Sequence, residues 1–341
     1  MKTCRIAVTM GDPAGVGAEV TVKAIQAIAG KAAAEILVIG DRRFIEKAVS
    51  VCGLPLTVKG IHSIDEMKSE PGVITVLDLQ NADPSAILYG QVSAAAGRAA
   101  YQYLELGIQL AREKKIAAVV TAPINKAALN QAGYHYSGHT EIFARLTETS
   151  DYAMMLVEGS FRVVHVTTHV ALRKACDLVT QKRVYQVIKL ADAAGKRMGI
   201  SNARIGVAGL NPHSGEGGLF GDEELREIIP AIEQAAAEGI AVEGPVPPDT
   251  VFVKARGGSY DFAIAMYHDQ GHIPLKMAGF TMEGKSMSIS GVNVTLGLPI
   301  IRTSVDHGTA FDQAGKGTAS AKSMIDAIEL AIRMSGEAEG A

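Results

Sequence analysis

The sequence alternates short, almost wholly apolar runs with longer stretches of helical period. Runs without a polar face are typical of strands that helices cover on both sides. The predicted strands are Ile6–Met10, Ile36–Ile39, Val73–Leu79, Ala117–Ala122, Val163–Thr168, Ile205–Leu210, Phe262–Tyr267 and Val292–Ile301. The predicted helices are a segment after Pro13 and stretches over roughly 92–114, 181–198, 222–238 and 320–334. This alternation predicts an α/β protein with mostly parallel strands, and the Gly-Pro-Val-Pro-Pro stretch at 244–248 is expected to be a loop.

The composition is that of an ordinary globular protein and argues against several classes of function. The 341 residues are 48% hydrophobic and 20% charged, with a net charge of −3 and no basic run, so we expect no nucleic-acid partner. No apolar stretch approaches the ~18 residues of a membrane span, so we expect no membrane association. The three cysteines stand far apart and form neither a disulfide framework nor a metal spacing, which favours a reducing, cytoplasmic location.

Histidines stand at or just past the ends of three predicted strands. These residues are His169, His213 and His268. Because the carboxyl ends of parallel strands share one edge of a sheet, three imidazoles placed there are able to bind Zn²⁺ or a similar divalent ion. Their separation along the chain is not a ligand spacing, however. Three separate histidines that cap backbone carbonyls explain the same positions equally well.

A polar turn, Gly133-Tyr-His-Tyr-Ser-Gly-His-Thr-Glu141, precedes an apolar helix predicted over Ile142–Leu146. The first turn of a helix offers free N–H groups to anions, and His139 and Thr140 would extend such a site toward a phosphate or carboxylate. Alternatively, Thr140 caps the helix and Glu141 complements its dipole. Arg302 and Lys276 are two further candidate cations for an anionic ligand, and a surface salt bridge is the other explanation for each.

The glycine-rich loop Gly11-Asp-Pro-Ala-Gly-Val-Gly17 follows a predicted strand and opens a helix, which is the setting of a phosphate-binding loop. It lacks the Gly-Lys-Ser/Thr ending of a P-loop. It also does not fit G-x-G-x-x-G, because the third glycine is absent. A dinucleotide, if one binds, is therefore not held by a standard fingerprint.

Seven motifs, in order along nearly the whole chain, together resemble the 4-hydroxythreonine-4-phosphate dehydrogenase family. They are MGDPAGVGAE (10–19), TAPINK (121–126), GHTE (138–141), TTH (167–169), LNPHSGEGG (210–218), YHDQGHIPLK (267–276) and RTSVDHGTA (302–310). The block from His307 to Ala319 also resembles the adenosine-binding loop of isocitrate and isopropylmalate dehydrogenases. Those β-decarboxylating enzymes have no standard Rossmann fingerprint either.

The resemblance implies a two-lobed α/β fold like that of isocitrate and isopropylmalate dehydrogenases, with mostly parallel sheets and an active-site cleft between the lobes. One lobe, on the cofactor side, would comprise residues 1–128 and 282–341, and the other, on the metal and dimer side, residues 129–281. It also implies a homodimer with shared active sites.

The resemblance further implies roles for individual side chains. The expected ligands of one divalent ion per site (Zn²⁺, Mg²⁺, Co²⁺ or Mn²⁺) are His169, His213 and His268. The expected contacts with a small phosphorylated hydroxy acid are His139, Thr140, Lys276, Asn293 and Arg302. The expected contacts with NAD, or with NADP, are Gly11, Asp12, His307, Gly308 and Asp312. Lys276 and Asp249 are candidate proton acceptors, although Asp249 could equally be structural or a partner of a ligand histidine.

Two departures from the pyridoxal-pathway enzymes concern the substrate. The segment between Lys276 and Asn293 is longer than those enzymes lead us to expect, and Val170-Ala-Leu172 stands where a proline is expected before the leucine. Both features resemble the branch that acts on D-threonate or D-erythronate 4-phosphate. The expected reaction is metal-assisted oxidation of the 3-hydroxyl by NAD, with loss of CO₂ to give dihydroxyacetone phosphate. The alternative is oxidation of 4-phosphohydroxy-L-threonine in pyridoxal 5'-phosphate biosynthesis.

Two other classes of protein are open from the residues alone. A phosphate-binding regulatory protein would keep the fold without catalysis, and the three intact histidines argue against it. A phosphoryl-transfer enzyme would use the Gly11–Gly17 loop, and the missing Lys-Ser/Thr ending argues against that reading.

Overall fold

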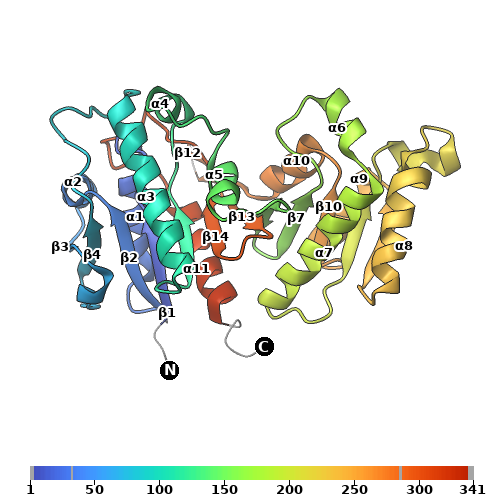
Figure 1. The fold of residues 1–341 in the computed structure, drawn as a ribbon, viewed down its shortest axis with the longest axis horizontal. Coiled ribbons are helices and arrows are strands. Elements are labelled where there is room, and N and C mark those ends of the chain that lie inside the picture. Colours follow the sequence, from blue (N-terminus) through green and yellow to red (C-terminus); the bar gives the residue numbers. More distant parts are fainter. Residues whose placement is uncertain (1–3, 32–33, 284–285, 337–341) are drawn as a thin grey trace. The chain divides into compact units, whose positions relative to one another are not determined.

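A computed structural model describes residues 4–31, 34–283 and 286–336 of the chain (Figure 1). The chain divides into two compact units. Unit 1 comprises Met1–Thr149 and Leu298–Ala341, and unit 2 comprises Ser150–Gly297. The lobes predicted from the resemblance likewise combine the two ends of the chain, and their boundaries stay a prediction.

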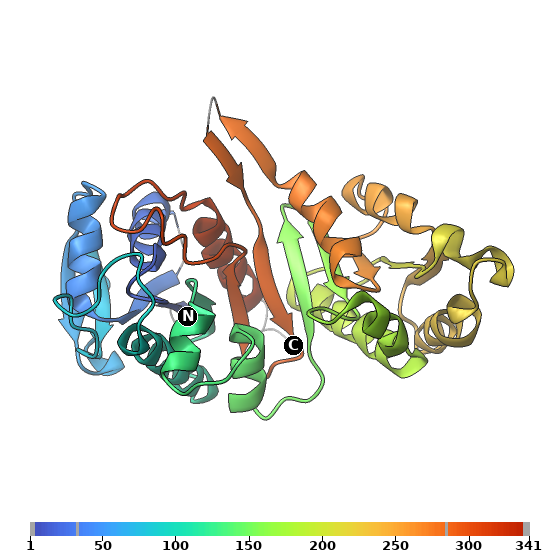
Figure 2. The same cartoon turned by 90° about the horizontal axis from the view of Figure 1, so that it is seen from above.

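The described residues of unit 1 form six parallel strands in the order β3-β4-β2-β1-β5-β14. Its strands are β1 (Cys4–Thr9), β2 (Ala34–Gly40), β3 (Thr57–Ile61), β4 (Val73–Asp78), β5 (Ala118–Thr121) and β14 (Ile301–Val305). Its helices are α1 (Gly17–Ile28), α2 (Arg42–Val51), η1 (Ile64–Glu66), α3 (Ala94–Arg112), α4 (Lys126–Gln131), α5 (His139–Leu146) and α11 (Lys322–Gly336). Helices α1, α2 and α11 cover one face of these strands and α3 covers the other (Figure 2).

Unit 2 contains strands in the order β13-β6-β7-β10-β8-β9, of which β6 is antiparallel to both neighbours while β7, β10, β8 and β9 run parallel. Its strands are β6 (Ala153–Glu158), β7 (Phe161–His165), β8 (Ile205–Ala208), β9 (Val242–Val246), β10 (Phe262–Ala265) and β13 (Val292–Leu296). Its helices are α6 (Leu172–Leu178), α7 (Gln181–Arg197), η2 (Pro212–Gly218), η3 (Glu224–Ile228), α8 (Ile229–Ala237), α9 (Pro248–Arg256) and α10 (His268–Ala278).

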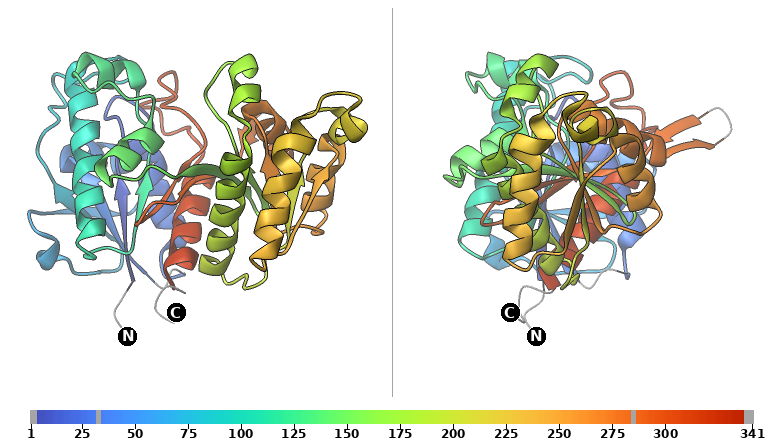
Figure 3. Two further views of the ribbon diagram at one scale, coloured as in Figure 1. Left: turned by 45° about the vertical axis from the view of Figure 1, so that its right-hand side comes forward. Right: turned by 90° about the vertical axis from the view of Figure 1, so that its right-hand side faces the viewer.

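The strands of unit 2 are also covered on both faces, by α7 and α8 on one side and by α9 and α10 on the other (Figure 3). Strands β11 (Phe280–Glu283) and β12 (Ser286–Ile289) form a separate antiparallel hairpin that extends beyond these helices.

The predicted α/β class with mostly parallel strands is confirmed. The nearly continuous apolar runs predicted this class correctly because they form strands that are covered on both faces: β5, β8 and β10 are buried at every residue.

Two sequence predictions of local structure are wrong. The run at 292–301 is two strands, β13 and β14, because Gly297 turns the chain between them with a φ of 90°. The stretch predicted as a loop at 244–248 includes part of strand β9. Pro245 is tolerated there because β9 is the last strand in the order, and an edge strand leaves N–H groups unpaired in any case.

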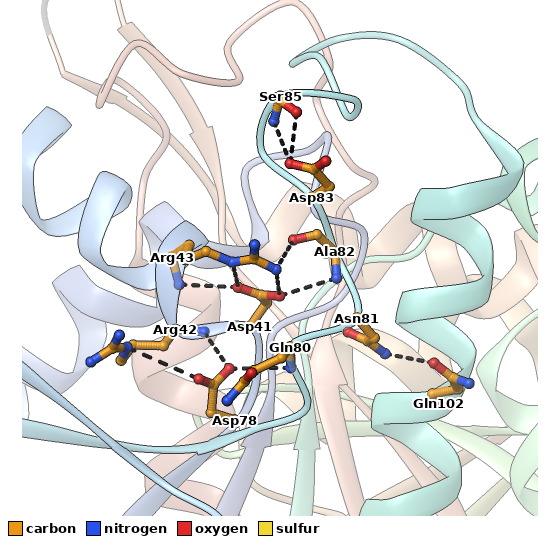
Figure 4. A network of polar contacts seen from close by, with 10 residues as sticks. All are labelled: Asp41, Arg42, Arg43, Asp78, Gln80, Asn81, Ala82, Asp83, Ser85 and Gln102. Atoms are coloured by element: carbon orange, nitrogen blue, oxygen red, sulfur yellow. Dashed lines mark hydrogen bonds and ion pairs between the residues drawn. The ribbon is translucent and has the colours of Figure 1, made fainter.

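A buried carboxylate fastens the end of β2 to the segment after β4 (Figure 4). Asp41 is 0% exposed, and its Oδ2 accepts hydrogen bonds from the Ala82 N–H at 3.0 Å and from Arg43 Nη2 at 2.8 Å. Burial alone would raise the pKa of Asp41, but these donors and the charge of Arg43 lower it overall. Since Asp41 also caps α2 through the Arg43 N–H, one side chain fixes a helix start and a loop together.

Among the helices that the structure describes, none is both long and apolar enough to serve as a membrane span.

We predict opposite effects of alanine at two glycines of α3. A Cβ at Gly97 would lie 2.1 Å from the Ala128 carbonyl oxygen of α4, so Gly97→Ala should lower the free energy of unfolding by about 1–3 kcal/mol or more. At Gly107 the nearest atom would be 3.4 Å away, and Gly107→Ala should be neutral or stabilise by up to ~1 kcal/mol, because alanine favours helix. Denaturant unfolding measures both values, and equal values would contradict the packing argument.

Candidate functional site

Three of the predicted site histidines follow three neighbouring parallel strands of unit 2. His169 comes after β7, His268 begins α10 directly after β10, and His213 lies in the loop after β8. Strand β10 pairs in parallel with both β7 and β8, so the three carboxyl ends lie side by side. The rings of His169 and His268 are 5.5 Å apart between centroids.

Two of these histidines have a carboxylate within hydrogen-bonding distance of Nδ1. His268 Nδ1 lies 2.6 Å from Asp269 Oδ1, and His213 Nδ1 lies 3.1 Å from Glu216 Oε1. A carboxylate accepts hydrogen bonds only, so each Nδ1 carries a hydrogen, and Nε2 is the ring nitrogen left to present a lone pair to a metal ion. This is the arrangement of histidines that ligate metals in proteins, where the second ring nitrogen donates to a carboxylate.

The loop that carries His213 has an unusual backbone. Residues 213–217 all have positive φ, with values of 52° at His213, 55° at Ser214 and 45° at Glu216. Left-handed backbone costs roughly 1–2 kcal/mol for each non-glycine residue, so the surrounding structure must hold it in place. The side chain of His213 is 65% exposed.

Two polar side chains to which the sequence analysis assigned no role, buried Glu224 and half-buried Gln270, hold these loops. Glu224, 2% exposed, accepts hydrogen bonds from the Leu210 N–H at 2.7 Å and the Asn211 N–H at 2.8 Å, which fixes the base of the His213 loop. Gln270 accepts from the Met266 N–H at 2.6 Å and donates to the Gly209 carbonyl at 2.9 Å. It thereby ties the end of β10 to the end of β8. Gln270 stands within the motif at 267–276, but the motif does not reveal its partners, and Glu224 lies outside the quoted motifs; each acts through a contact that the fold creates.

Within residues 4–31, 34–283 and 286–336, no three His, Cys, Asp or Glu side chains are grouped closely enough to hold a metal ion. His169, His213 and His268 share an edge of the strands, and the rings of His169 and His268 lie 5.5 Å apart between centroids. The three-histidine metal site therefore stays a prediction.

Two more histidines are buried behind His268. His165 is 0% exposed and His272 is 7% exposed, and their rings are 4.7 Å apart between centroids. Burial lowers the pKa of His165 to about 3 and that of His272 to about 4, so both rings are neutral at neutral pH.

The other predicted residues of unit 2 lie at separate places. Lys276 is exposed in the last turn of α10, and Asn293 is half-buried on β13. Asp249 is exposed in the first turn of α9 and accepts a hydrogen bond from Thr250 Oγ1 at 3.3 Å. These positions neither assign nor remove a role as proton acceptor for Lys276 or Asp249.

In unit 1, a buried arginine lies beside the start of α5. Arg302 on β14 is 2% exposed, and its Nη2 donates to Thr121 Oγ1 at 3.0 Å. Burial lowers its pKa to about 9, which leaves the guanidinium charged at neutral pH. Burial, followed by the charge of Arg302, lowers the pKa of His139 well below its usual range, while a hydrogen bond to the Ala122 backbone opposes this. His139 Nε2 is buried and has no hydrogen-bond partner among the described residues.

The alternative role of Thr140 as a helix cap is wrong. Helix α5 begins at His139, with Gly138 at the N-cap and no side-chain cap, so Thr140 lies inside the first turn. Glu141 does complement this turn, because its carboxylate accepts the Ser137 N–H at 2.6 Å.

The two segments predicted to contact the cofactor are joined in unit 1. The Val16 N–H donates to the Thr309 carbonyl at 3.0 Å, and buried Glu19 accepts the Gly315 and Gly317 N–H groups, each at 2.6 Å. The loop after β14 is thus held against the glycine-rich loop after β1. Gly308 and Asp312 lie in that loop, where Asp312 is exposed and its carbonyl accepts a hydrogen bond from Lys316.

Several buried polar atoms near these loops have no hydrogen-bond partner among the residues that the structure describes. They are Thr9 Oγ1, Asp12 Oδ2 and His307 Nε2. Buried polar atoms are nearly always hydrogen-bonded in folded proteins, so such atoms suit a ligand that supplies the missing partner. Gly11 allows its own backbone to pack close to that of Pro123, because a Cβ on residue 11 would lie 2.4 Å from the Pro123 carbonyl oxygen.

We predict a pH dependence from Asp12, which is 1% exposed. Burial raises its pKa from 3.8 to about 6, although N–H groups of Ala14 and Asn125 oppose the shift. The folded chain therefore binds more protons than the unfolded chain in this window, and the stability contribution of Asp12 falls as the pH rises from about 4 to about 6. Relative to Asp12→Asn, the wild type should lose about 3 kcal/mol of unfolding free energy across that window. Urea unfolding at several pH values measures the difference, and a pH-independent difference would contradict the shift.

Comparison with known proteins places the chain in a family. The family described as "Pyridoxal phosphate biosynthetic protein PdxA" matches residues 32–331. The chain is 48% identical over 335 residues to the D-threonate 4-phosphate dehydrogenase of Salmonella typhimurium, which covers 98% of this chain and 100% of that protein. It is 46% identical over 333 residues to the D-threonate 4-phosphate dehydrogenase of Cupriavidus necator, covering 96% and 97% of the two chains.

A crystal structure of 4-hydroxythreonine-4-phosphate dehydrogenase from Klebsiella pneumoniae has the same fold. It matches with a TM-score of 0.87 and 44% identity, over 98% of each chain. The resemblance drawn from the sequence motifs and the prediction of a dehydrogenase of that family are confirmed: the chain belongs to the PdxA family.

Proposed function

We propose that this chain oxidises the 3-hydroxyl of D-threonate 4-phosphate or D-erythronate 4-phosphate with NAD, and that the product loses CO₂ to give dihydroxyacetone phosphate and NADH. The observation that carries the proposal is the end-to-end similarity to proteins named D-threonate 4-phosphate dehydrogenase. The site histidines and the joined cofactor segments described above support the same chemistry. NADP is the alternative cofactor.

A second candidate substrate is 4-phosphohydroxy-L-threonine, the amino analogue at C2. The 44% identity to the Klebsiella pneumoniae enzyme named for that substrate favours it. The longer segment between Lys276 and Asn293 favours the threonate branch instead, although its residues 284 and 285 lie outside the described part of the chain.

The chemistry of the donor set suits a divalent metal ion. His169, His213 and His268 would hold it, because two of these rings present Nε2 with a carboxylate behind Nδ1 and the rings of His169 and His268 are 5.5 Å apart. Zn²⁺, Mg²⁺, Co²⁺ and Mn²⁺ are candidates. Such an ion, when bound, supplies Lewis acidity that lowers the pKa of a hydroxyl and stabilises an enolate.

The chain's own residues would bind and orient the substrate. Arg302 supplies a charged, buried guanidinium suited to two-pronged contact with a phosphate or carboxylate. His139 is neutral, and the bond to Ala122 leaves its Nε2 as an acceptor, so it would accept a hydrogen bond from a substrate hydroxyl. Thr140, Lys276 and Asn293 would complete the set. Binding energy from the phosphate, remote from C3, would hold the reacting carbon in place.

Lys276 and Asp249 are the proposed alternatives for the group that accepts the hydroxyl proton. Lys276 lies on the same helix as His268, and Asp249 lies at the start of α9. Substituting each residue in turn would distinguish the two candidates. The proton acceptor is the residue whose loss lowers kcat and changes the pH profile of kcat.

The cofactor would lie on the joined loops of unit 1. Glu19 holds the Gly315–Gly317 backbone, and Asp12 Oδ2 and His307 Nε2 are acceptors suited to hydroxyl donors such as those of ribose. Gly11 and Gly308 would allow the backbone to approach, and Asp312 would contact the adenosine end.

A homodimer is the proposed assembly, in the cytoplasm. Three large apolar side chains near the end of α10 are exposed, namely Ile273 at 58%, Met277 at 73% and Phe280 at 43%. Neighbouring exposed apolar side chains of this kind are typical of protein contacts, and a second copy of the chain is the partner we propose for them.

The reaction is tested by NADH formation at 340 nm with Mg²⁺ or Zn²⁺ and each of three compounds: D-threonate, D-erythronate and L-4-hydroxythreonine 4-phosphates. We expect the hydroxy acids to turn over faster, and EDTA to abolish the signal until metal is restored. Faster turnover of the amino acid would instead support 4-phosphohydroxy-L-threonine as the substrate. No turnover with any of them, despite bound metal, would overturn the substrate class.

The carboxylate behind His268 gives a second prediction. Asp269→Asn replaces an obligate acceptor by an amide that need not hold the proton on Nδ1, so metal affinity should fall about 10- to 100-fold. A chelator-competition titration with Zn²⁺ measures this. Asp222→Asn, which removes an exposed ion pair with Arg226, is the matched control and should leave the affinity unchanged. Equal affinities of the wild type and Asp269→Asn would contradict the assignment.

A further inference from the structure

A buried pair of histidines, His165 and His272, lies directly behind His268. The rings of His268 and His272, one helical turn apart on α10, stack at 3.6 Å between centroids with a tilt of 15°. We propose that His165 and His272 are positioning residues: they form a hydrogen-bonded chain that fixes the ring of His268 and aims its Nε2. This inference rests on the proposed role of His268 as a metal ligand.

The contacts of the pair assign both protons. His272 Nδ1 lies 3.0 Å from the carbonyl oxygen of His268, which only accepts, so His272 Nδ1 carries a hydrogen. The same Nδ1 lies 3.1 Å from His165 Nε2, which must therefore be the acceptor. His165 Nδ1 then carries the other proton and donates to the Met154 carbonyl at 3.3 Å. The hydrogen bonds therefore all run in one direction, from His272 to His165 and from His165 to the backbone of β6.

Gly271 provides independent support for this arrangement. It is a buried glycine inside α10 without a positive φ, a position where alanine would ordinarily favour the helix. A Cβ there would lie 2.4 Å from His165 Nε2 and 2.7 Å from Val163 Cγ1. The helix can therefore approach the His165 ring only because this residue has no side chain.

The ring of His268 is consequently held on two sides. Asp269 accepts from its Nδ1 edge at 2.6 Å, and His272 covers one face. Because Asp269 is on the exposed side of the helix start, with a side chain 71% exposed, it sets the tautomer but restrains the ring weakly. The buried pair supplies the rigid support. A ligand ring with few accessible rotations binds a metal with less loss of entropy.

The first test is the protonation pattern of the wild-type protein. Long-range ¹H–¹⁵N spectra of ¹⁵N-histidine-labelled protein report which ring nitrogen carries the hydrogen. We expect His165 and His272 both to be protonated at Nδ1 at pH 7, with the two signals assigned by their loss in single variants. Protonation of His165 at Nε2 would overturn the proposed chain.

The second test separates the hydrogen bond from the stacked ring. His272→Leu removes both, whereas His272→Asn keeps an N–H donor near the Nδ1 position. Zn²⁺ affinity by chelator competition should fall about tenfold or more in His272→Leu and less in His272→Asn. The absorption spectrum of the Co²⁺-loaded protein should change in the same order. His62→Leu makes the matched change at an exposed histidine of unit 1 and should change neither.

The outcomes distinguish this inference from the proposed function. A wild type that binds no metal would overturn the metal-dependent function and the role of the pair with it. A wild type that binds metal, together with a folded His272→Leu of equal affinity and unchanged Co²⁺ spectrum, would overturn the inference alone. If His272→Leu does not fold, His272→Asn and the wild-type spectra decide the matter in the same way.

Discussion

The carboxylate of Glu224 accepts two backbone N–H groups, those of Leu210 and Asn211, and so anchors the base from which the left-handed His213 loop leaves the strand. Glu19 does the same for the backbone at Gly315 and Gly317. Asp41 does so for the segment at Ala82. Loops at the carboxyl ends of strands lack the regular backbone hydrogen bonds that pair strands, so their N–H groups need another acceptor. A buried carboxylate satisfies several of them at once with charge-assisted bonds.

Much of the fold could be predicted from the sequence because its signals are local. Strands such as β8 and β10 are apolar at every position, which identifies them without any knowledge of their neighbours. The failures were of two kinds. Gly297 ends a strand inside one apolar run, and Pro245 stands in a strand whose tolerance for proline depends on its being at an edge. Edge position is a property of the whole sheet, so a local pattern cannot report it.

The same distinction applies to the site. Histidines at strand ends could be predicted, because the carboxyl ends of neighbouring parallel strands meet at one edge. The family motifs added roles to them. The supporting residues could not be predicted. His165 and His272 are 107 positions apart and meet only because α10 packs on β7, and Gln270 acts by joining two strand ends. Their identity as polar residues is visible in the sequence, whereas their partners are decided by packing.

The division of the chain has a consequence for its synthesis. Unit 2 is one continuous segment, Ser150–Gly297, and all of its main strands have been made when that segment is complete. Unit 1 is discontinuous, because β14 pairs with β5 across 180 or so intervening positions and α11 packs against β14, β5 and β1. The first 149 residues therefore leave the ribosome without their last strand and covering helix. Long-range closure of this kind is slow. During that interval one edge of β5 and part of its face lack their final partners, so nascent unit 1 exposes an unpaired strand edge until β14 and α11 have been made.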